Sequence, residues 1–333
     1  MLDNLEKALN GLRIHQVFDY VIGVSTGAII AALLVGLKLT VVECKQLYRE
    51  IAVQLFDQSR VRGATGLLLS HAYYDTDVWV KFLRRSIGEV HLMDSIVDAN
   101  STKLAFVSAV VNQPRVQAYL FRNYNPPPTR PSIYDGSANY KIWQAVQASG
   151  AAPGYFQEVI LDENVHQDGG VLVNNPTAIG LHECRILWPD TRIGAVVSLG
   201  NGRFVPNVVS VGTTGADKKS TAAPPSFSSF KDKIIKIIDS ASDTEMVHTI
   251  LHDLLTGGNY FRFNPCMTQE FLLDENRPEQ LDAMERDAQM YCRKNWPKFE
   301  SAAYAALKSK TATQRASEWI QLEAIKKFNR ALV

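Results

Sequence analysis

A short apolar strand, a sharp turn and an apolar helix follow one another between residues 18 and 34. The turn reads Gly23-Val24-Ser25-Thr26-Gly27, which is a G-x-S-x-G pattern. Between a strand and a helix, this pattern is typical of a nucleophile elbow, in which a strained serine projects its hydroxyl from the end of a sheet. The glycines at both ends remove side chains that would collide across the turn. We therefore expect Ser25 to be a nucleophile.

Two other interpretations of this stretch remain open. G-x-S-x-G also occurs by chance, and only the flanking strand and helix argue against chance here. Residues 21–37 carry no charge, and about 17 residues is the lower limit for a helix that spans a membrane. However, the segment contains glycine, serine and threonine and lacks flanking basic clusters, which favours a buried helix of an α/β core.

Composition narrows the class of protein. Lys plus Arg number 35 and Asp plus Glu number 34, so the chain is nearly neutral and we expect no nucleic acid as a partner. The four cysteines are scattered without a C-x-x-C pair, which predicts neither a zinc cluster nor a disulfide framework. We expect no metal and no other cofactor. The first twenty residues show no secretory signal, so we expect an intracellular protein that is not secreted.

Strand and helix patterns alternate up to about residue 205, which predicts an α/β fold with helices on both faces of a parallel or mixed sheet. The expected helices there are 2–12, 41–56, 140–148 and 176–188, and the expected strands are 103–111, 116–121, 156–161 and 193–199. Further helices are expected at 230–238, 244–255, 278–307 and 313–328, with one strand at 260–263. We therefore predict a catalytic domain at 1–205, a flexible insertion at 206–229 and a helical region at 230–333 packed on the catalytic domain.

A serine hydroxyl is a weak nucleophile at neutral pH and needs a base. None of the histidines stands in a context that marks it as the partner of Ser25; they are His15, His71, His91, His166, His182, His248 and His252. Asp168 is better placed, because it closes a short strand and precedes Gly169 and Gly170, where the backbone can turn sharply. Catalytic groups of α/β sheets collect at such strand ends. An Asp-Gly turn that merely links two strands is the alternative.

The elbow, together with Asp168-Gly169-Gly170 and the following Asn174-Asn175-Pro176, resembles a patatin-like phospholipase. Residues 149–156 and 198–202 extend this likeness. Residues 121–124, 140–145, 182–184 and 260–265 are similar to the gamma type of calcium-independent phospholipases A2. The resemblance covers nearly the whole chain and is weakest in the Ser/Pro-rich insertion.

The resemblance implies a three-layer α/β/α fold with a mostly parallel central sheet and C-terminal helices. It implies a dyad without histidine, in which Ser25 is the nucleophile, Asp168 is the proton acceptor and the Thr26 backbone N–H binds the oxyanion. Gly23, Gly27, Gly169 and Gly170 complete the motifs. The implied reaction is calcium-independent hydrolysis of fatty acyl esters of glycerophospholipids at a membrane surface. The implied location is the periphery of mitochondrial, peroxisomal or endoplasmic reticulum membranes.

One family motif is missing from the sequence. Members carry a strand that ends in D-G-G-G-x-R-G, and the N–H groups of this loop bind the oxyanion. We therefore expect a catalytic domain that is truncated at its N-terminus or naturally lacks the loop. Three hypotheses stay open: a lipid acyl hydrolase, a catalytically impaired relative that binds lipid or a partner, and a soluble esterase with a Ser–His–Asp triad. The oligomeric state is also open.

Overall fold

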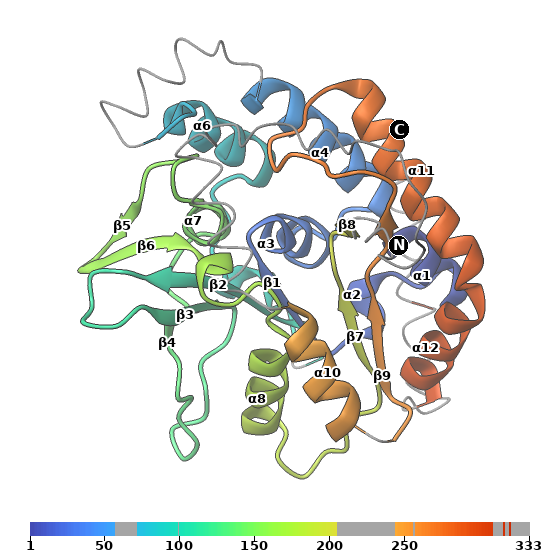
Figure 1. Ribbon diagram of the computed structural model, residues 1–333. Helices are drawn as coiled ribbons and strands as arrows, with labels where there is room; N and C mark the ends of the chain where they lie inside the picture. The colour runs from blue at the N-terminus through green and yellow to red at the C-terminus, as the bar shows by residue number, and fades with distance from the viewer. Residues whose placement is uncertain are drawn as a thin grey trace, which may run out of the picture.

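The computed structural model describes residues 1–56, 72–98, 100–204, 244–255 and 257–308, together with residues 316 and 320. Within these parts, a six-stranded mixed sheet carries helices on both sides, and two smaller strand pairs lie beside it (Figure 1). The expected α/β fold is therefore confirmed. The insertion expected at 206–229 and the helices expected at 230–238 and 313–328 fall outside the continuously described residues.

The bounds of the elements are as follows. The helices are α1 (Leu2–Ala8), α2 (Ile14–Val17), α3 (Thr26–Ala31), η1 (Ala32–Gly36), α4 (Val41–Phe56), α6 (Thr76–Ile87), η2 (Met93–Ser95), α7 (Ile142–Ser149), η3 (Gly169–Val171), α8 (Thr177–Leu187), α10 (Thr244–Leu254), α11 (Pro278–Lys294) and α12 (Trp296–Lys308). The strands are β1 (Tyr20–Val24), β2 (Lys103–Val110), β3 (Gln117–Arg122), β4 (Asp135–Ser137), β5 (Val159–Leu161), β6 (Asn164–Asp168), β7 (Val196–Leu199), β8 (Arg203–Phe204), β9 (Tyr260–Phe263) and β10 (Cys266–Met267).

Strand β2 is the centre of the large sheet, because three strands pair with it. β3 runs antiparallel along one edge of β2. β1 runs parallel to the first part of the opposite edge, and β6 runs antiparallel to the last part of that same edge. β1 and β6 therefore approach each other with their carboxyl ends facing along one edge of β2.

The expectation of a mostly parallel sheet is wrong. β2 pairs antiparallel with β3 and β6, and β5 pairs antiparallel with β6, whereas β1 and β4 join by parallel pairings. The reason is the short connection between successive strands: only residues 162 and 163 separate β5 from β6. Such a link allows an antiparallel hairpin, while a parallel pair needs a long crossover.

The apolar helical run after Ser25 lies inside the core. Ala28, Leu33, Leu34 and Val35 of α3 and η1 are at most 3% exposed and pack with the buried side chains of β2. This burial explains the absence of charge between residues 21 and 37. In the parts of the chain that the structure describes, no helix is long and apolar enough to cross a membrane.

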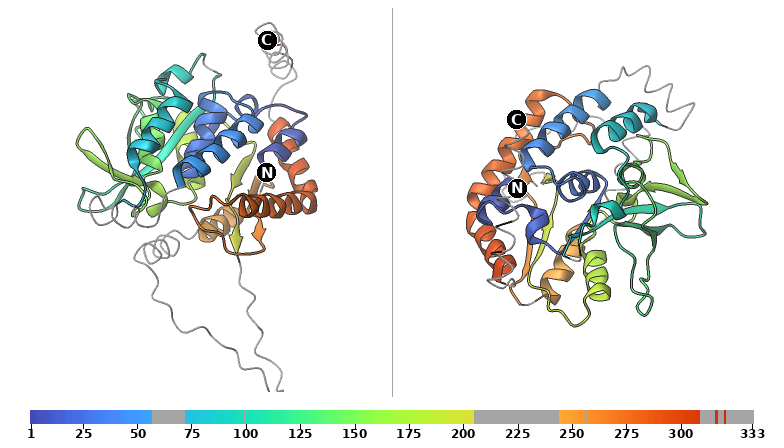
Figure 2. Two further views of the ribbon diagram at one scale, coloured as in Figure 1. Left: turned by 90° about the horizontal axis from the view of Figure 1, so that it is seen from above. Right: turned by 180° about the vertical axis from the view of Figure 1, so that it is seen from behind.

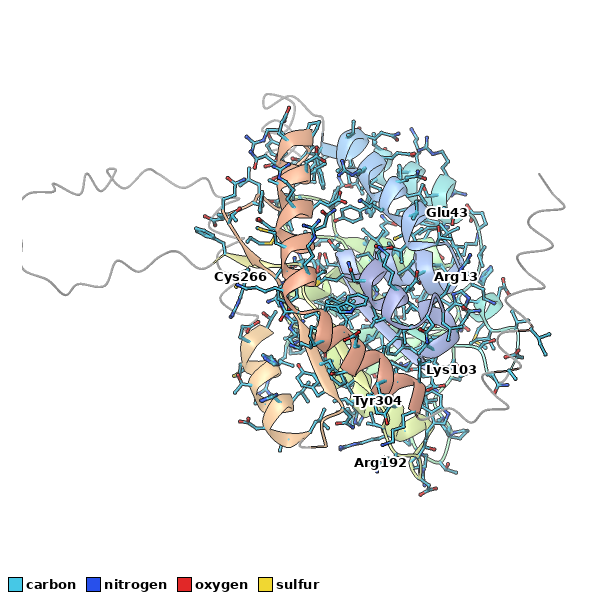
Figure 3. All side chains as sticks on the ribbon, turned by 90° about the vertical axis from the view of Figure 1, so that its right-hand side faces the viewer. Arg13, Glu43, Lys103, Arg192, Cys266 and Tyr304 are labelled. Carbon is cyan, nitrogen blue, oxygen red and sulfur yellow. The ribbon has the colours of Figure 1, made fainter. Side chains whose placement is uncertain are left out.

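The C-terminal helices form a layer beside the N-terminal ones (Figure 2). Phe299 of α12 stacks on Phe263 of β9 at a ring distance of 4.2 Å, and Arg49 of α4 binds Glu285 of α11 at 2.9 Å. Figure 3 faces this layer, with Tyr304 of α12 at its surface. The contacts suit a helical region packed on the catalytic domain, although the division into domains stays a prediction.

Several predicted elements are shorter or divided in the structure. The helix expected at 2–12 ends earlier, where Asn10 and Gly11 have φ angles of 59° and 82°, and α2 follows separately. The helix expected at 278–307 breaks at Asn295, whose side chain binds the carbonyl of Tyr291 at 2.8 Å. The strand at 260–263 and the helix at 41–56 agree with the prediction.

Candidate active site

Ser25 stands between β1 and α3 with a strained backbone, at φ 53° and ψ −122°. Residues other than glycine rarely adopt such a positive φ, and strained backbones of this kind cluster at active sites. A side chain at Gly23 would lie 2.2 Å from the carbonyl oxygen of Gly27, so the turn requires a glycine at position 23. The pattern also predicts that a side chain at position 27 would collide across the turn. This is wrong, because a β-carbon at Gly27 would meet no atom within 4 Å apart from its own helix and chain neighbours. The space beside Gly27 is open to a ligand.

Asp168 comes close to Ser25 because β6 runs along β2 in the direction opposite to β1. Val24, the last residue of β1, pairs with Val107 of β2. Asp168, the last residue of β6, pairs with Ser108, the next residue of β2. The two strand ends therefore meet on adjacent positions of one edge, and this register places Ser25 beside Asp168.

The two side chains are joined directly. Ser25 Oγ donates a hydrogen bond to Asp168 Oδ2 at 2.5 Å, and the backbone N–H of Gly170 donates to Asp168 Oδ1 at 2.7 Å. A β-carbon at Gly169 would lie 2.4 Å from the carbonyl oxygen of Val107, so the chain passes too close to β2 for any other residue. The sequence motifs around Ser25 and Asp168 thus form one compact site.

Burial controls the charge of this carboxyl group. Asp168 is 5% exposed, and burial raises its pKa to about 6, although the hydrogen bonds from Ser25 and Gly170 act in the opposite direction. At neutral pH the group is still mostly ionised, yet it is a stronger base than an ordinary aspartate. The arrangement can therefore take a proton from the Ser25 hydroxyl. Across the described ranges, no group of three or more His, Cys, Asp or Glu side chains could hold a metal ion.

Sequence reasoning gave no role to Ser149, the last residue of α7. Its fully buried hydroxyl accepts a hydrogen bond from the Ser25 N–H at 3.0 Å and donates to the Val107 carbonyl at 2.6 Å. Ser149 therefore ties the strained backbone of Ser25 to β2. The sequence shows a serine at the end of a predicted helix, but it does not show that this hydroxyl contacts Ser25, which lies 124 positions away in the chain.

None of the described histidines is hydrogen-bonded to Ser25 or to Asp168. His166, two residues before Asp168, is fully buried, and its Nδ1 lies 2.9 Å from the Ser108 hydroxyl. Burial lowers the pKa of His166 to about 4, so this ring is neutral. His71 lies outside the described residues. Ser25 therefore has Asp168, and no described histidine, as its hydrogen-bond partner, which does not match a Ser–His–Asp triad.

A large cavity opens beside the pair. Its volume is about 2580 Å³, and both Ser25 and Asp168 line it. β1 pairs only with β2 among the described strands, and β7 pairs only with β9, while both strands line this cavity. The first N–H groups of a helix have no acceptor within the helix, so the Thr26 N–H at the start of α3 can donate to an oxyanion. The described residues supply no strand beside β1 that could add a second donor.

Comparisons with known proteins agree with this geometry. The sequence profile described as patatin-like phospholipase matches residues 6–181, a range that includes Ser25 and Asp168. The chain is 41% identical over 312 residues to calcium-independent phospholipase A2-gamma of Rattus norvegicus, covering 93% of this chain and 38% of that protein. It is 28% identical over 319 residues to phospholipase A I of Arabidopsis thaliana, covering 80% of this chain and 23% of the relative. The chain thus spans well under half the length of these relatives.

Proposed function

Because the chain belongs to the patatin-like phospholipase family, we propose that it is a lipid acyl hydrolase that cleaves fatty acyl esters of glycerophospholipids through Ser25. The observation that carries the proposal is the 2.5 Å hydrogen bond from Ser25 Oγ to Asp168 Oδ2 in a strained elbow. The relatives named phospholipase A2-gamma and phospholipase A I support this substrate class.

In the proposed reaction, Asp168 takes the hydroxyl proton while Ser25 Oγ attacks the ester carbonyl carbon. The tetrahedral intermediate carries a negative charge on the former carbonyl oxygen, which the Thr26 N–H stabilises. Collapse of the intermediate breaks the ester bond, and the lysophospholipid oxygen leaves with the proton held by Asp168. Water then attacks the acyl-Ser25 ester while Asp168 takes its proton, and Asp168 returns this proton to Ser25 Oγ as the bond to the fatty acid breaks.

The cavity suits a lipid substrate. Leu34, Ile51, Leu55 and Phe156 are among the side chains that line it and offer apolar contacts to an acyl chain. Leu272 and Leu273, which are 62% and 54% exposed, lie on the rim of the same cavity. We propose that the protein works at a phospholipid membrane surface inside the cell, on mitochondrial, peroxisomal or endoplasmic reticulum membranes. Apolar side chains at the rim favour entry of lipid from such a surface.

A second candidate function is that of a catalytically impaired relative that binds lipid or a partner. The observation in its favour is the unpaired edge of β1 among the described strands, next to an oxyanion position with one visible donor. Removing one oxyanion donor from an enzyme typically lowers the rate by about 10²–10³. Slow hydrolysis with retained lipid binding would distinguish this candidate.

The test is release of fatty acid and lysophospholipid from phosphatidylcholine vesicles by the purified chain, with and without EDTA. We expect hydrolysis that survives EDTA, since the nucleophile needs no metal to activate it. Ser25→Ala should reduce hydrolysis to background and leave the unfolding temperature nearly unchanged, because the hydroxyl borders an open cavity. Ser301→Ala, at an exposed position of α12, is the matched control and should keep full activity. Vesicle binding without hydrolysis by the native chain would favour the second candidate, and full activity of Ser25→Ala would refute the first.

A further inference from the structure

Arg262 is a buried cation on β9, in the wall of the same cavity. It is 7% exposed and pairs in register with Ser198 of β7. Phe261 and Phe263, its neighbours in the strand, belong to the hydrophobic core, so strand alternation directs Arg262 to the opposite face. The sequence pattern predicts this strand but indicates no function for Arg262.

Few contacts offset the cost of burying this guanidinium group. Nη1 donates to the Ser198 hydroxyl at 3.1 Å, whereas Nε is buried without a hydrogen-bond partner. No described carboxylate forms an ion pair with Arg262: Glu245, whose charge acts on it, accepts from Arg203 and Asn264 instead. Burial lowers the pKa of Arg262. A buried, unpaired charge is costly, so such a group usually has a partner of opposite charge.

The surroundings of Arg262 are polar and connect it to the dyad. Arg262, Ser198 and Asn175 line the cavity that also contains Ser25 and Asp168. The Ser198 hydroxyl donates to Asn175 Oδ1 at 3.4 Å and also accepts from Thr177 Oγ1 at 2.8 Å, so its position beside Arg262 is fixed. A β-carbon at Gly200 would lie only 2.8 Å from Arg262 Nη2, so the chain at Gly200 leaves room for the guanidinium group at this wall.

We propose that Arg262, held in place by the Ser198 hydroxyl, binds the phosphodiester of the glycerophospholipid whose acyl ester lies at Ser25. The planar guanidinium fork matches two phosphate oxygens, and the negative charge supplies the missing counter-ion. Arg262 then selects phospholipids over neutral acylglycerols, which carry no phosphate. This inference rests on the proposed function, because the substrate joins the two positions.

The first test compares dihexanoylphosphatidylcholine with dihexanoylglycerol, both below the concentration at which they aggregate. Arg262→Gln should lower the ratio of kcat/KM for the phospholipid to kcat/KM for the glycerol ester by about tenfold to a hundredfold, mainly through KM, as expected for a charge-assisted hydrogen bond. Arg262→Lys should recover part of the ratio. Arg85→Gln, a change at an exposed arginine of α6, should leave the ratio as it is. Equal loss for both substrates would overturn the proposal.

The second test needs no catalysis. Calorimetric titration of Ser25→Ala protein with sn-glycero-3-phosphocholine should show binding that Arg262→Gln weakens about tenfold or more. Inorganic phosphate is titrated in parallel. Tighter binding of sn-glycero-3-phosphocholine than of inorganic phosphate indicates a headgroup site, and equal binding indicates a general phosphate site. If the native chain hydrolyses no lipid but binding depends on Arg262, the proposed function fails and the anion site stands. If hydrolysis occurs and neither readout depends on Arg262, the anion site is refuted. Should Arg262→Gln not fold, Ser198→Ala gives the same readouts with an expected loss of about threefold.

Discussion

Asp168 and Glu183 are both buried carboxylates, but the protein holds them in different ways. Glu183 of α8 accepts hydrogen bonds from Arg122 at 2.9 and 3.1 Å and from Tyr124 at 2.6 Å. Among the described residues, Asp168 accepts from the Ser25 hydroxyl and the Gly170 N–H alone. Burial raises the pKa of both groups, yet the bonds to Glu183 outweigh it and leave that pKa below its usual value, whereas the pKa of Asp168 rises to about 6.

We propose that this difference separates a structural group, Glu183, from a reactive one, Asp168. A carboxylate neutralised by a bidentate arginine cannot readily accept a proton, and its network fixes α8 against β3. A carboxylate with few donors retains its basicity and can take the Ser25 proton. In the proposed mechanism, the carboxylate that stabilises the fold has a complete set of partners, and the carboxylate that accepts a proton has an incomplete one.

The largest effect on this comparison is expected from Asp168→Asn. Activity should fall by about 10⁴, the scale of losing the carboxylate of a serine-hydrolase site. Stability at pH 8 should stay equal or rise, because the native state no longer holds an ionised carboxylate that burial disfavours. Steady-state hydrolysis and thermal unfolding measure the two quantities. As controls, single histidine variants such as His248→Asn should keep most activity. A histidine variant as inactive as Ser25→Ala would instead support a Ser–His–Asp triad.

A smaller effect is expected from adding donors at the oxyanion. A version carrying an N-terminal strand that ends in D-G-G-G-x-R-G should hydrolyse vesicles faster by about 10²–10³, the scale of one oxyanion donor. The added charge stabilisation acts in the transition state and leaves Asp168 unchanged. Both proteins are assayed on the same vesicles and normalised to folded protein by circular dichroism. Equal turnover would mean that another backbone segment already forms the oxyanion site.

Glu183→Gln tests the structural side of the comparison. The change leaves the Arg122 guanidinium buried at 3% exposure without its counter-ion, so the free energy of unfolding should fall by about 3 kcal/mol at pH 7. The loss should shrink as the pH falls below the ordinary pKa of a glutamate, because the unfolded chain with the native Glu183 then gains a proton while the folded carboxyl, with its lowered pKa, is still ionised. Urea unfolding at pH 7 and pH 4 measures both values. An unchanged midpoint at pH 7 would show that the ion pair adds nothing net.

Local patterns predicted the parts of the site that depend on neighbouring residues. The turn around Ser25 needs its glycine at position 23, and the Asp168-Gly169-Gly170 stretch likewise shows its constraint in sequence. The meeting of β1 and β6 was not predictable, because it depends on the register of both strands along β2. The same holds for Ser149 and for the pairing of Arg122 with Glu183, since these contacts join residues far apart in the chain.

In the proposed mechanism, Asp168 alone activates Ser25. The most direct measurement is the rate at which a fluorophosphonate labels Ser25 as a function of pH, read by mass spectrometry. The base acts only when ionised, so the rate should rise with pH through a midpoint of about 6 and level off above it. Asp168→Asn should slow labelling by at least about 10³ and remove this midpoint. Labelling that keeps the same midpoint and rate in Asp168→Asn would contradict the account.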